Sequence, residues 1–288
     1  MLKRSITADE ISSYQKDGFV HLRNVLDESW LEVLDAAVGR VENEVDMHPR
    51  VMNMSAFRRQ LDAKKGLDTE SGEATGDYII AHNAWQWNDE LRNIAFESPM
   101  AEMAARLMDA EAIRFYFDQI FIKPPGSNLR TTFHQDLGYW TCRGDQICTF
   151  WAPVDKITLA NGAMGYVPGS HLWEENFKAN VFIDREAIKD QEGADLPDIE
   201  SDEAKYGVVY VECEPGDVIV HHVKTVHGSG GNVTSNATRR SIAFRYTGDD
   251  VVYHMPPGIP SDSTPISDTL TDGEPLSGDL FPLIWSNE

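Results

Sequence analysis

From Ala112 onward the chain is a succession of short segments rich in β-branched and aromatic residues. They are separated by turns of Gly, Pro, Asn and Asp, and several such strands at this spacing predict a β-sandwich or barrel. The segments are "IRFYFDQIFIK", "CTFWAPVD", "GAMGYVPG", "YGVVYVECEPGDVIVHHV" and "RSIAFRYTGDDVVYH". A β-sandwich or barrel often reaches the 288 residues of this chain as one unit, so we expect a single mainly β domain.

The first third, about residues 1–111, is predicted to be mainly helical. Thr7 and Glu10 form a capping box before a helix that Gly18 ends, and a strand, "FVHLRNVL", follows. Asp27 is expected to cap "ESWLEVLDAAVGRVENEV", and Ser98 to cap a helix with Pro99 at its first position. Three stretches lack a clear helical or strand periodicity in their apolar residues. They are interpreted as a loop or lid (46–77), a surface excursion (184–205) and, beyond a β core of about 112–255, an irregular tail from Pro256.

The formal charge of −22 disfavours nucleic acids and anionic membranes as partners. It does not exclude a small anionic substrate, because one or two arginines in a pocket can outweigh a distant acidic surface. Three cysteines without metal-site spacing predict free thiols. The basic start leads into polar residues, and no apolar run approaches the roughly 18 residues of a membrane helix, so we expect a cytoplasmic protein.

A candidate metal site begins with "TTFHQDLGYW", in which His134 and Asp136 would share one face of a strand. Such a pair is common by chance, and the usual explanation is a surface pair or a satisfied core histidine. His227, at the lip of a Gly-rich turn after "VIVHHV", is the expected third ligand. Two histidines and one carboxylate form a facial set that leaves three octahedral positions open, as in non-haem Fe(II) oxygenases.

The strand "RRSIAFRY" supplies a candidate anion anchor. Arg239, Ser241 and Arg245 would share one face of it. An inward Arg239 beside Ser241 could bind a carboxylate bidentately. A dicarboxylate co-substrate such as 2-oxoglutarate needs this anchor, since its other end would chelate the iron where dioxygen also binds.

The sequence resembles the phytanoyl-CoA dioxygenase family of Fe(II)/2-oxoglutarate oxygenases. The resemblance covers roughly residues 8–247 and rests on seven segments in family order. They are "YQKDGFVHLRNVL", "FDQIFIKPPGS", "HQDLGYW", "NGAMGYVPGSH", "PGDVIVHH", "HGSGGN" and "RRSIAFRY". It implies a double-stranded β-helix, or jelly roll of the cupin type, with the N-terminal helices packed on one sheet.

The resemblance also implies the roles of individual residues. Iron would lie on His134, Asp136 and His227, and 2-oxoglutarate on Arg239, with Arg240 as a rival. The remaining co-substrate contacts implied are Ser229, Trp151, Gln135 and Gln119. Related halogenases replace the carboxylate with a small residue, so Asp136 favours hydroxylation.

The expected activity is therefore hydroxylation of a small metabolite with conversion of 2-oxoglutarate to succinate. Desaturation, epoxidation or cyclisation at the same site, or a non-redox cupin-like enzyme, are the alternatives. An acyl-CoA would need basic residues, which cluster only near Arg58 and Lys64. Other candidate substrate contacts are Trp85, Trp87, Tyr139, Trp140, Arg130 and Arg245. The sequence leaves the oligomeric state open.

Overall fold

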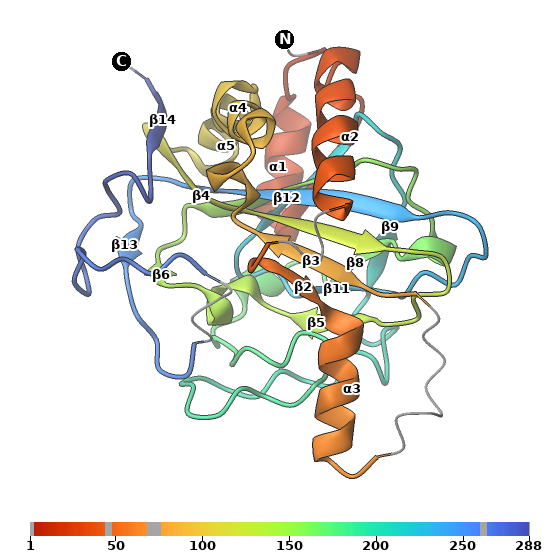
Figure 1. Ribbon diagram of the computed structural model, residues 1–288. Helices are drawn as coiled ribbons and strands as arrows, with labels where there is room; N and C mark the ends of the chain where they lie inside the picture. Colours follow the sequence, from red (N-terminus) through yellow and green to blue (C-terminus); the bar gives the residue numbers. More distant parts are fainter. Residues whose placement is uncertain (1–2, 44–47, 68–75, 260–263, 288) are drawn as a thin grey trace.

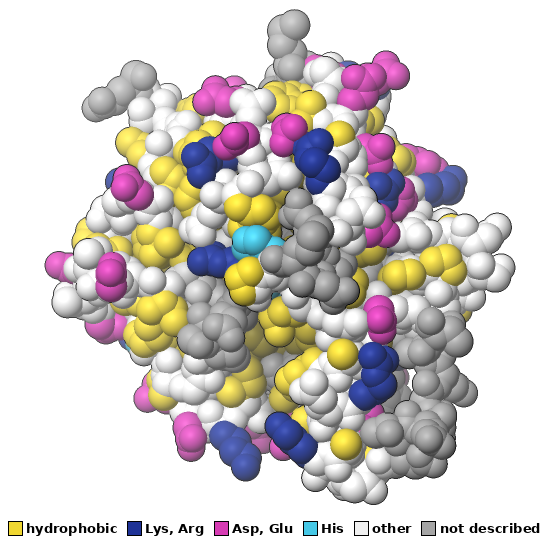
Figure 2. All heavy atoms as spheres, viewed as in Figure 1, with side chains coloured by type: hydrophobic (Ala, Val, Ile, Leu, Met, Phe, Trp, Pro, Cys, Tyr) yellow, Lys and Arg dark blue, Asp and Glu magenta, His cyan; other side chains and the backbone are white. Residues whose placement is uncertain are grey.

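The protein is described by a computed structural model that covers residues 3–43, 48–67, 76–259 and 264–287. A large antiparallel sheet lies between a layer of helices and a smaller sheet (Figure 1). On the face shown in Figure 2, hydrophobic side chains are interspersed with acidic and basic ones, and a histidine lies near the middle. Among the described residues there is no helix whose length and apolar character suit a membrane crossing.

The large sheet has the order β1-β10-β7-β12-β4-β3-β2, with β14 also paired to β4. Its strands are β1 (Phe19–Leu22), β10 (Val218–His222), β7 (Ile147–Pro153), β12 (Arg239–Thr247), β4 (Ala112–Lys123), β3 (Ile79–His82), β2 (Val51–Asn53) and β14 (Leu283–Ser286). The smaller sheet has the order β5-β11-β8-β9. It contains β5 (Thr131–His134), β11 (His227–Ser229), β8 (Met164–Tyr166) and β9 (Val209–Val211), and a separate pair joins β13 (Val252–Tyr253) to β6 (Cys142–Arg143).

Four helices, α1, α2, α4 and α5, cover the outer face of the large sheet, whereas α3 projects from the opposite side (Figure 1). Their bounds are α1 Ala8–Asp17, α2 Glu28–Glu42, α3 Met54–Lys64, α4 Asp89–Glu97 and α5 Met100–Met108. The short 3-10 helices are η1 (Ala84–Gln86), η2 (Asp136–Tyr139), η3 (Leu159–Asn161) and η4 (Ser170–Leu172).

Strand alternation separates the core from the site. On β12, Ile242 and Phe244 point toward the helices and belong to the larger apolar cluster. Their neighbour Ala243 points the other way, into a second cluster between the two sheets. Arg239 and Arg245 share this inward face and line the cavity between the sheets. Period-two alternation thus delivers the polar residues of this strand to one interior space.

The structure confirms the predicted mainly β, jelly-roll fold and its helical N-terminal part. The Thr7–Glu10 capping box, the Asp27 cap and the left-handed Gly18 at the end of α1 are present as expected. The described cysteines are free and buried.

Several local predictions were wrong. Residues 51–64, expected in a loop, form β2 and α3, although 46–47 and 68–75 lie outside the described residues. The cap of α5 is Pro99, because Ser98 closes the preceding helix with its backbone N–H. The described tail is irregular as expected up to residue 282, but it then adds β14 to the edge of β4.

Candidate metal centre and co-substrate pocket

His134 and His227 face each other across two paired strands. His134 ends β5, His227 begins β11, and the two residues are partners in the antiparallel register. Their ring centroids are 4.4 Å apart. Gly228 permits this close pairing, because a Cβ there would meet the carbonyl oxygen of Thr131 at 3.0 Å. The strand pairing therefore brings together two histidines that are far apart in the sequence.

Backbone carbonyls fix the tautomer of both rings. The Nδ1 of His134 lies 2.7 Å from the carbonyl oxygen of Thr132, and the Nδ1 of His227 lies 2.9 Å from that of Thr225. A carbonyl can only accept, so each Nδ1 carries the proton. In the neutral ring the Nε2 lone pair is then free to bind a metal, the arrangement typical of metal-ligating histidines.

Asp136 completes the group although it lies outside the predicted strand. β5 ends at His134, and Asp136 begins η2. Gln135 keeps an extended backbone, with φ −101° and ψ 140°, so Asp136 still points to the same side as His134. Its Oδ1 lies 3.5 Å from Nε2 of His134 and 3.8 Å from Nε2 of His227.

The other carboxylate oxygen of Asp136 is held by residues that the sequence did not single out. Thr149 donates its hydroxyl to Oδ2 over 3.2 Å, and Nε2 of His221 lies 3.5 Å from the same oxygen. His221 was missed because "VIVHH" is typical of an ordinary buried strand. The two oxygens of Asp136 therefore differ, with Oδ1 facing the histidine pair and Oδ2 facing the protein.

Electrostatics favour the protonation states that a metal needs. Burial opposes ionisation of Asp136, but His227 and the neighbouring imidazoles outweigh it and hold its pKa well below the usual value. Burial lowers the pKa of His227 well below its usual value, and the nearby His221 and His134 lower it further. A carboxylate beside two imidazoles is a donor set suited to a divalent transition metal.

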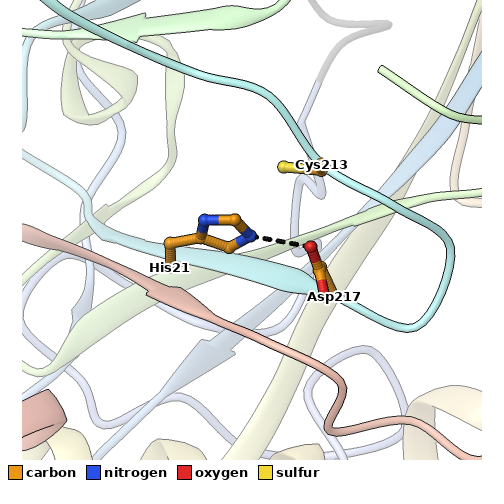
Figure 3. A group of neighbouring side chains, drawn as sticks. All are labelled: His21, Cys213 and Asp217. Atoms are coloured by element: carbon orange, nitrogen blue, oxygen red, sulfur yellow. Dashed lines mark hydrogen bonds and ion pairs between the residues drawn. The ribbon is translucent and has the colours of Figure 1, made fainter. Parts of the chain in front are cut away.

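A second group of metal-ligating residue types, His21, Cys213 and Asp217, has a structural explanation (Figure 3). Asp217 accepts hydrogen bonds from the backbone N–H groups of Asn24 and Glu214, and its Oδ2 lies 2.9 Å from Nε2 of His21. Burial raises the pKa of the Cys213 thiol to about 12, which disfavours the thiolate that binds metals. This group therefore serves to join β1 to the turn before β10.

The cavity beside the His134–Asp136–His227 group ends at a buried guanidinium. Arg239 is 1% exposed, and it donates to Ser241 Oγ over 3.2 Å and to the carbonyl of Gly162 over 3.0 Å. Its Nε is buried without a hydrogen-bond partner, and no described carboxylate forms an ion pair with it. Burial lowers its pKa to about 10, so the group stays charged at neutral pH. A buried and unpaired cation is costly, and an anionic ligand would offset that cost.

A buried lysine lies behind this end of the cavity, where burial and the nearby Arg239 lower its pKa well below the usual value. Lys123, with no solvent exposure, donates to Ser229 Oγ over 3.0 Å and to the carbonyl of Gly230 over 2.8 Å. Trp151 lies under Arg239, with the guanidinium carbon 4.9 Å from its ring centroid. Ser229 and Trp151 both line the cavity that contains Arg239.

Three other candidate residues lie elsewhere. Gln135 points away from the Arg239 cavity, because its amide contacts the backbone of Lys224 and Phe177. Gln119 faces an adjacent outer cavity instead. Arg240 lies on the opposite face of β12 and pairs with Asp155 and Asp35, each at 2.7 Å, so it does not compete with Arg239.

The remaining substrate candidates divide between core and cavity. Trp85 is buried in the helix-side core, and Trp87 packs against that core and stacks on His48. Tyr139, Trp140 and Arg245 line the outer cavity. Most basic residues in and just after α3 are paired, since Arg58 lies 2.9 Å from Asp62, Arg59 3.5 Å from Asp77 and Lys65 3.0 Å from Asp184. The exposed Arg130 pairs with Glu203.

Comparison with known proteins identifies the family. The family model for phytanoyl-CoA dioxygenase matches residues 14–241. The chain belongs to the phytanoyl-CoA dioxygenase family. A probable phytanoyl-CoA dioxygenase of Caenorhabditis elegans is 25% identical over 264 residues, which cover 87% of this chain and 78% of that protein. A probable α-ketoglutarate-dependent hypophosphite dioxygenase of Stutzerimonas stutzeri is 28% identical, covering 64% of this chain and 62% of that protein.

Solved structures agree with this membership. The non-haem α-ketoglutarate-dependent carbocyclase SnoK from nogalamycin biosynthesis superposes with a TM-score of 0.71 and 27% identity, covering 99% of each chain. The epimerase SnoN, solved with Fe³⁺, α-ketoglutarate and nogalamycin RO, has a TM-score of 0.70 and 22% identity over 96% of this chain and 98% of that one. The protein is an iron- and 2-oxoglutarate-dependent dioxygenase, the class predicted from the sequence.

Proposed function

We propose that this phytanoyl-CoA dioxygenase family member hydroxylates a small metabolite and acts as one oxygenase unit over its whole length. Iron would be held by Nε2 of His134, Oδ1 of Asp136 and Nε2 of His227. The distal carboxylate of 2-oxoglutarate would be bound by Arg239. The observation that carries this proposal is a cavity with a metal-type donor set at one end and the unpaired Arg239 at the other.

The residues present fit both groups. When bound, iron supplies the oxidising chemistry that converts 2-oxoglutarate, dioxygen and a substrate C–H bond to succinate, carbon dioxide and a C–OH group. The chain contributes the rest. Thr132 and Thr225 orient the histidines, and Thr149 keeps Oδ2 of Asp136 turned to the protein. Ser241 and Trp151 hold the guanidinium of Arg239 in place by a hydrogen bond and by ring contact.

Cyclisation is the second candidate activity, and the similarity to a carbocyclase favours it. It would use the same site with a substrate whose own nucleophile or second carbon lies near the activated position. Desaturation, epoxidation and a non-redox metal reaction stay as further alternatives. Retention of Asp136 supports hydrogen abstraction followed by hydroxylation over halogenation. Location in the cytoplasm also stays a prediction.

The proposal is tested by adding Fe(II) and 2-oxoglutarate to the protein without oxygen. We expect a weak visible charge-transfer band, because the keto-acid would chelate the metal. Arg239→Gln should weaken 2-oxoglutarate binding by at least about tenfold, since a desolvated charged hydrogen-bond pair is lost. Arg240→Gln is the matched control, because this neighbour faces the opposite side and pairs with acids.

Absence of the band from folded wild-type protein would overturn the proposal. An equal loss of 2-oxoglutarate affinity in Arg239→Gln and Arg240→Gln would also overturn it. A metabolite screen that follows succinate release then identifies the substrate. Product analysis of the best substrate separates hydroxylation from cyclisation, since hydroxylation adds one oxygen atom and cyclisation removes two hydrogens.

A further inference from the structure

An outer cavity of about 410 Å³ adjoins the candidate metal centre. It shares Asp136, Phe182 and Arg245 with the inner cavity that ends at Arg239, so the two spaces meet beside the proposed metal ligands. Its walls come from the start of α3, from β4 and from the segment around residues 180–188. These walls are mainly apolar, with Phe117, Trp140 and Phe182 among the aromatic side chains that line them.

One charged side chain in this apolar cavity has unused hydrogen-bond donors. Arg245 is 4% exposed, and its Nη2 donates to Oε1 of Gln119 over 2.7 Å. Its Nε and Nη1 are buried without partners. No described carboxylate lies within ion-pair distance of it, and burial lowers its pKa to about 10 although Asp136 and Asp118 act in the opposite direction. Its guanidinium carbon lies 4.3 Å from the ring centroid of Phe117 and 5.3 Å from that of Trp140. The two rings flank the guanidinium, and Arg245 lines the wall that the outer and inner cavities share.

The contacts of Gln119 add a third unused donor. Because Oε1 of Gln119 accepts from Arg245, its Nε2 is the donor to Nε2 of His82, 2.8 Å away. Burial, with Arg245 nearby, lowers the pKa of His82 to about 3, so the ring is neutral. Its proton must then be on Nδ1, which is also buried without a partner. Arg245 and His82, which both line the outer cavity, thus contain buried donors without protein partners.

We propose that the substrate has a largely apolar body and one carboxylate or similar oxyanion, which Arg245 binds. This inference rests on the proposed oxygenase function and names the substrate class of the same site. A buried guanidinium without an ion pair favours an anion over a neutral carbonyl, because charge-assisted hydrogen bonds are about twice as strong. Anchoring at Arg245 would place the apolar body along Phe117 and Trp140, close to Oδ1 of Asp136.

The size and charge of the surroundings narrow the class further. A cavity of 410 Å³ is in the range of small-molecule sites. An acyl-CoA would need cations for its phosphates, and in the basic segment around α3 the residues Arg58, Arg59 and Lys65 are already paired with acidic residues. The geometry therefore points to a free acid rather than a coenzyme A thioester.

The test compares 2-naphthylacetate with its neutral analogue 2-naphthylacetamide, titrated calorimetrically into the intact protein. We expect the acid to bind at least tenfold more tightly than the amide. Arg245→Gln should remove this preference while leaving amide binding unchanged, and Arg245→Lys should restore part of it. Arg240→Gln is the control and should retain the full preference.

Several results would overturn the inference. These are failure of the acid to bind, equal binding of acid and amide, or an unchanged preference in folded Arg245→Gln. Loss of the preference in Arg239→Gln instead would place the acid in the inner cavity and also overturn it. The binding assay needs neither iron nor 2-oxoglutarate. The calorimetric result is therefore independent of the charge-transfer band that tests the oxygenase function. Arg245→Gln should still show that band.

Discussion

At the scale of single residues, the site depends on how each ligand atom is oriented by a neighbour. The two oxygens of Asp136 illustrate this, since Thr149 holds Oδ2 while Oδ1 faces both histidines. A carboxylate fixed in this way can offer one oxygen to a metal without first losing rotational freedom. Removing it would leave two imidazoles, whose affinity for a divalent ion is much lower.

We therefore expect Asp136→Ala to lower Fe(II) affinity by at least about 100-fold and to abolish hydroxylation, because one of three ligands is lost. Anaerobic equilibrium dialysis measures the affinity and the number of ions bound. Cys213→Ala is the control, because it alters the other group of ligand-type residues. Tight binding of one ion by Asp136→Ala, or its loss in Cys213→Ala, would contradict the assignment.

The sequence was informative about the side chains that lie on a regular strand. Alternation along β12 correctly put Arg239, Ser241 and Arg245 on one face. It could not find His221 or Thr149, because their closeness to Asp136 depends on how β7 and β10 pair in the sheet. The side chain of Gln135 points away from the cavity because it bonds to the backbone of Lys224 and Phe177, and these residues are also remote in sequence.

At the scale of elements, the end of α1 helps to position His227. The carbonyl of Gly18 accepts hydrogen bonds from the backbone N–H of His222 and from the hydroxyl of Thr225. The carbonyl of Thr225 in turn fixes Nδ1 of His227. Gly18 also adopts φ +77°, and a Cβ there would lie 2.4 Å from Nδ1 of His171 and 2.5 Å from Oγ1 of Thr225. The turn after α1 therefore requires glycine for two independent reasons.

Gly18→Ala should destabilise the fold by about 2–5 kcal/mol, which combines left-handed backbone strain with overpacking. Gly66→Ala is the matched control, because Gly66 has φ +70° but nothing within 4 Å of the added Cβ. It should cost about 1–2 kcal/mol, from the backbone strain alone. Chemical denaturation measures both. Equal losses in the two variants would show that the close contacts at Gly18 relax freely.

Elements with strong local signals were predictable, and those stabilised by remote partners were not. Capping residues and apolar periodicity marked α1 and α2. β2 and α3 escaped because their sequence is polar, and β2 forms by pairing with β3. β14 is likewise defined by its partner β4 rather than by its own residues. Tertiary pairing overrides weak propensity in such segments.

At the scale of the whole molecule, an acidic surface surrounds cavities that contain buried cations. The chain has 25 basic and 47 acidic residues, so at least 22 acids have no basic counterpart to pair with. Exposed ion pairs such as Arg40–Glu90 contribute little, because water screens them. Self-repulsion among the excess acids is therefore the larger electrostatic effect on folding, and the compact state concentrates that charge.

The melting temperature should consequently rise as sodium chloride increases from about 10 mM to about 0.15 M, over which the Debye length falls from about 30 Å to about 8 Å. The rise should occur at neutral pH and shrink near pH 5, since the sequence pI is about 4.7 and the excess negative charge is then largely titrated. Differential scanning calorimetry at both pH values checks this difference. A melting temperature that falls with salt at neutral pH would mean that favourable ion pairs outweigh repulsion. Salt should leave the interactions of the buried Arg239 and Arg245 nearly unchanged, because it screens surface charges much more than buried ones.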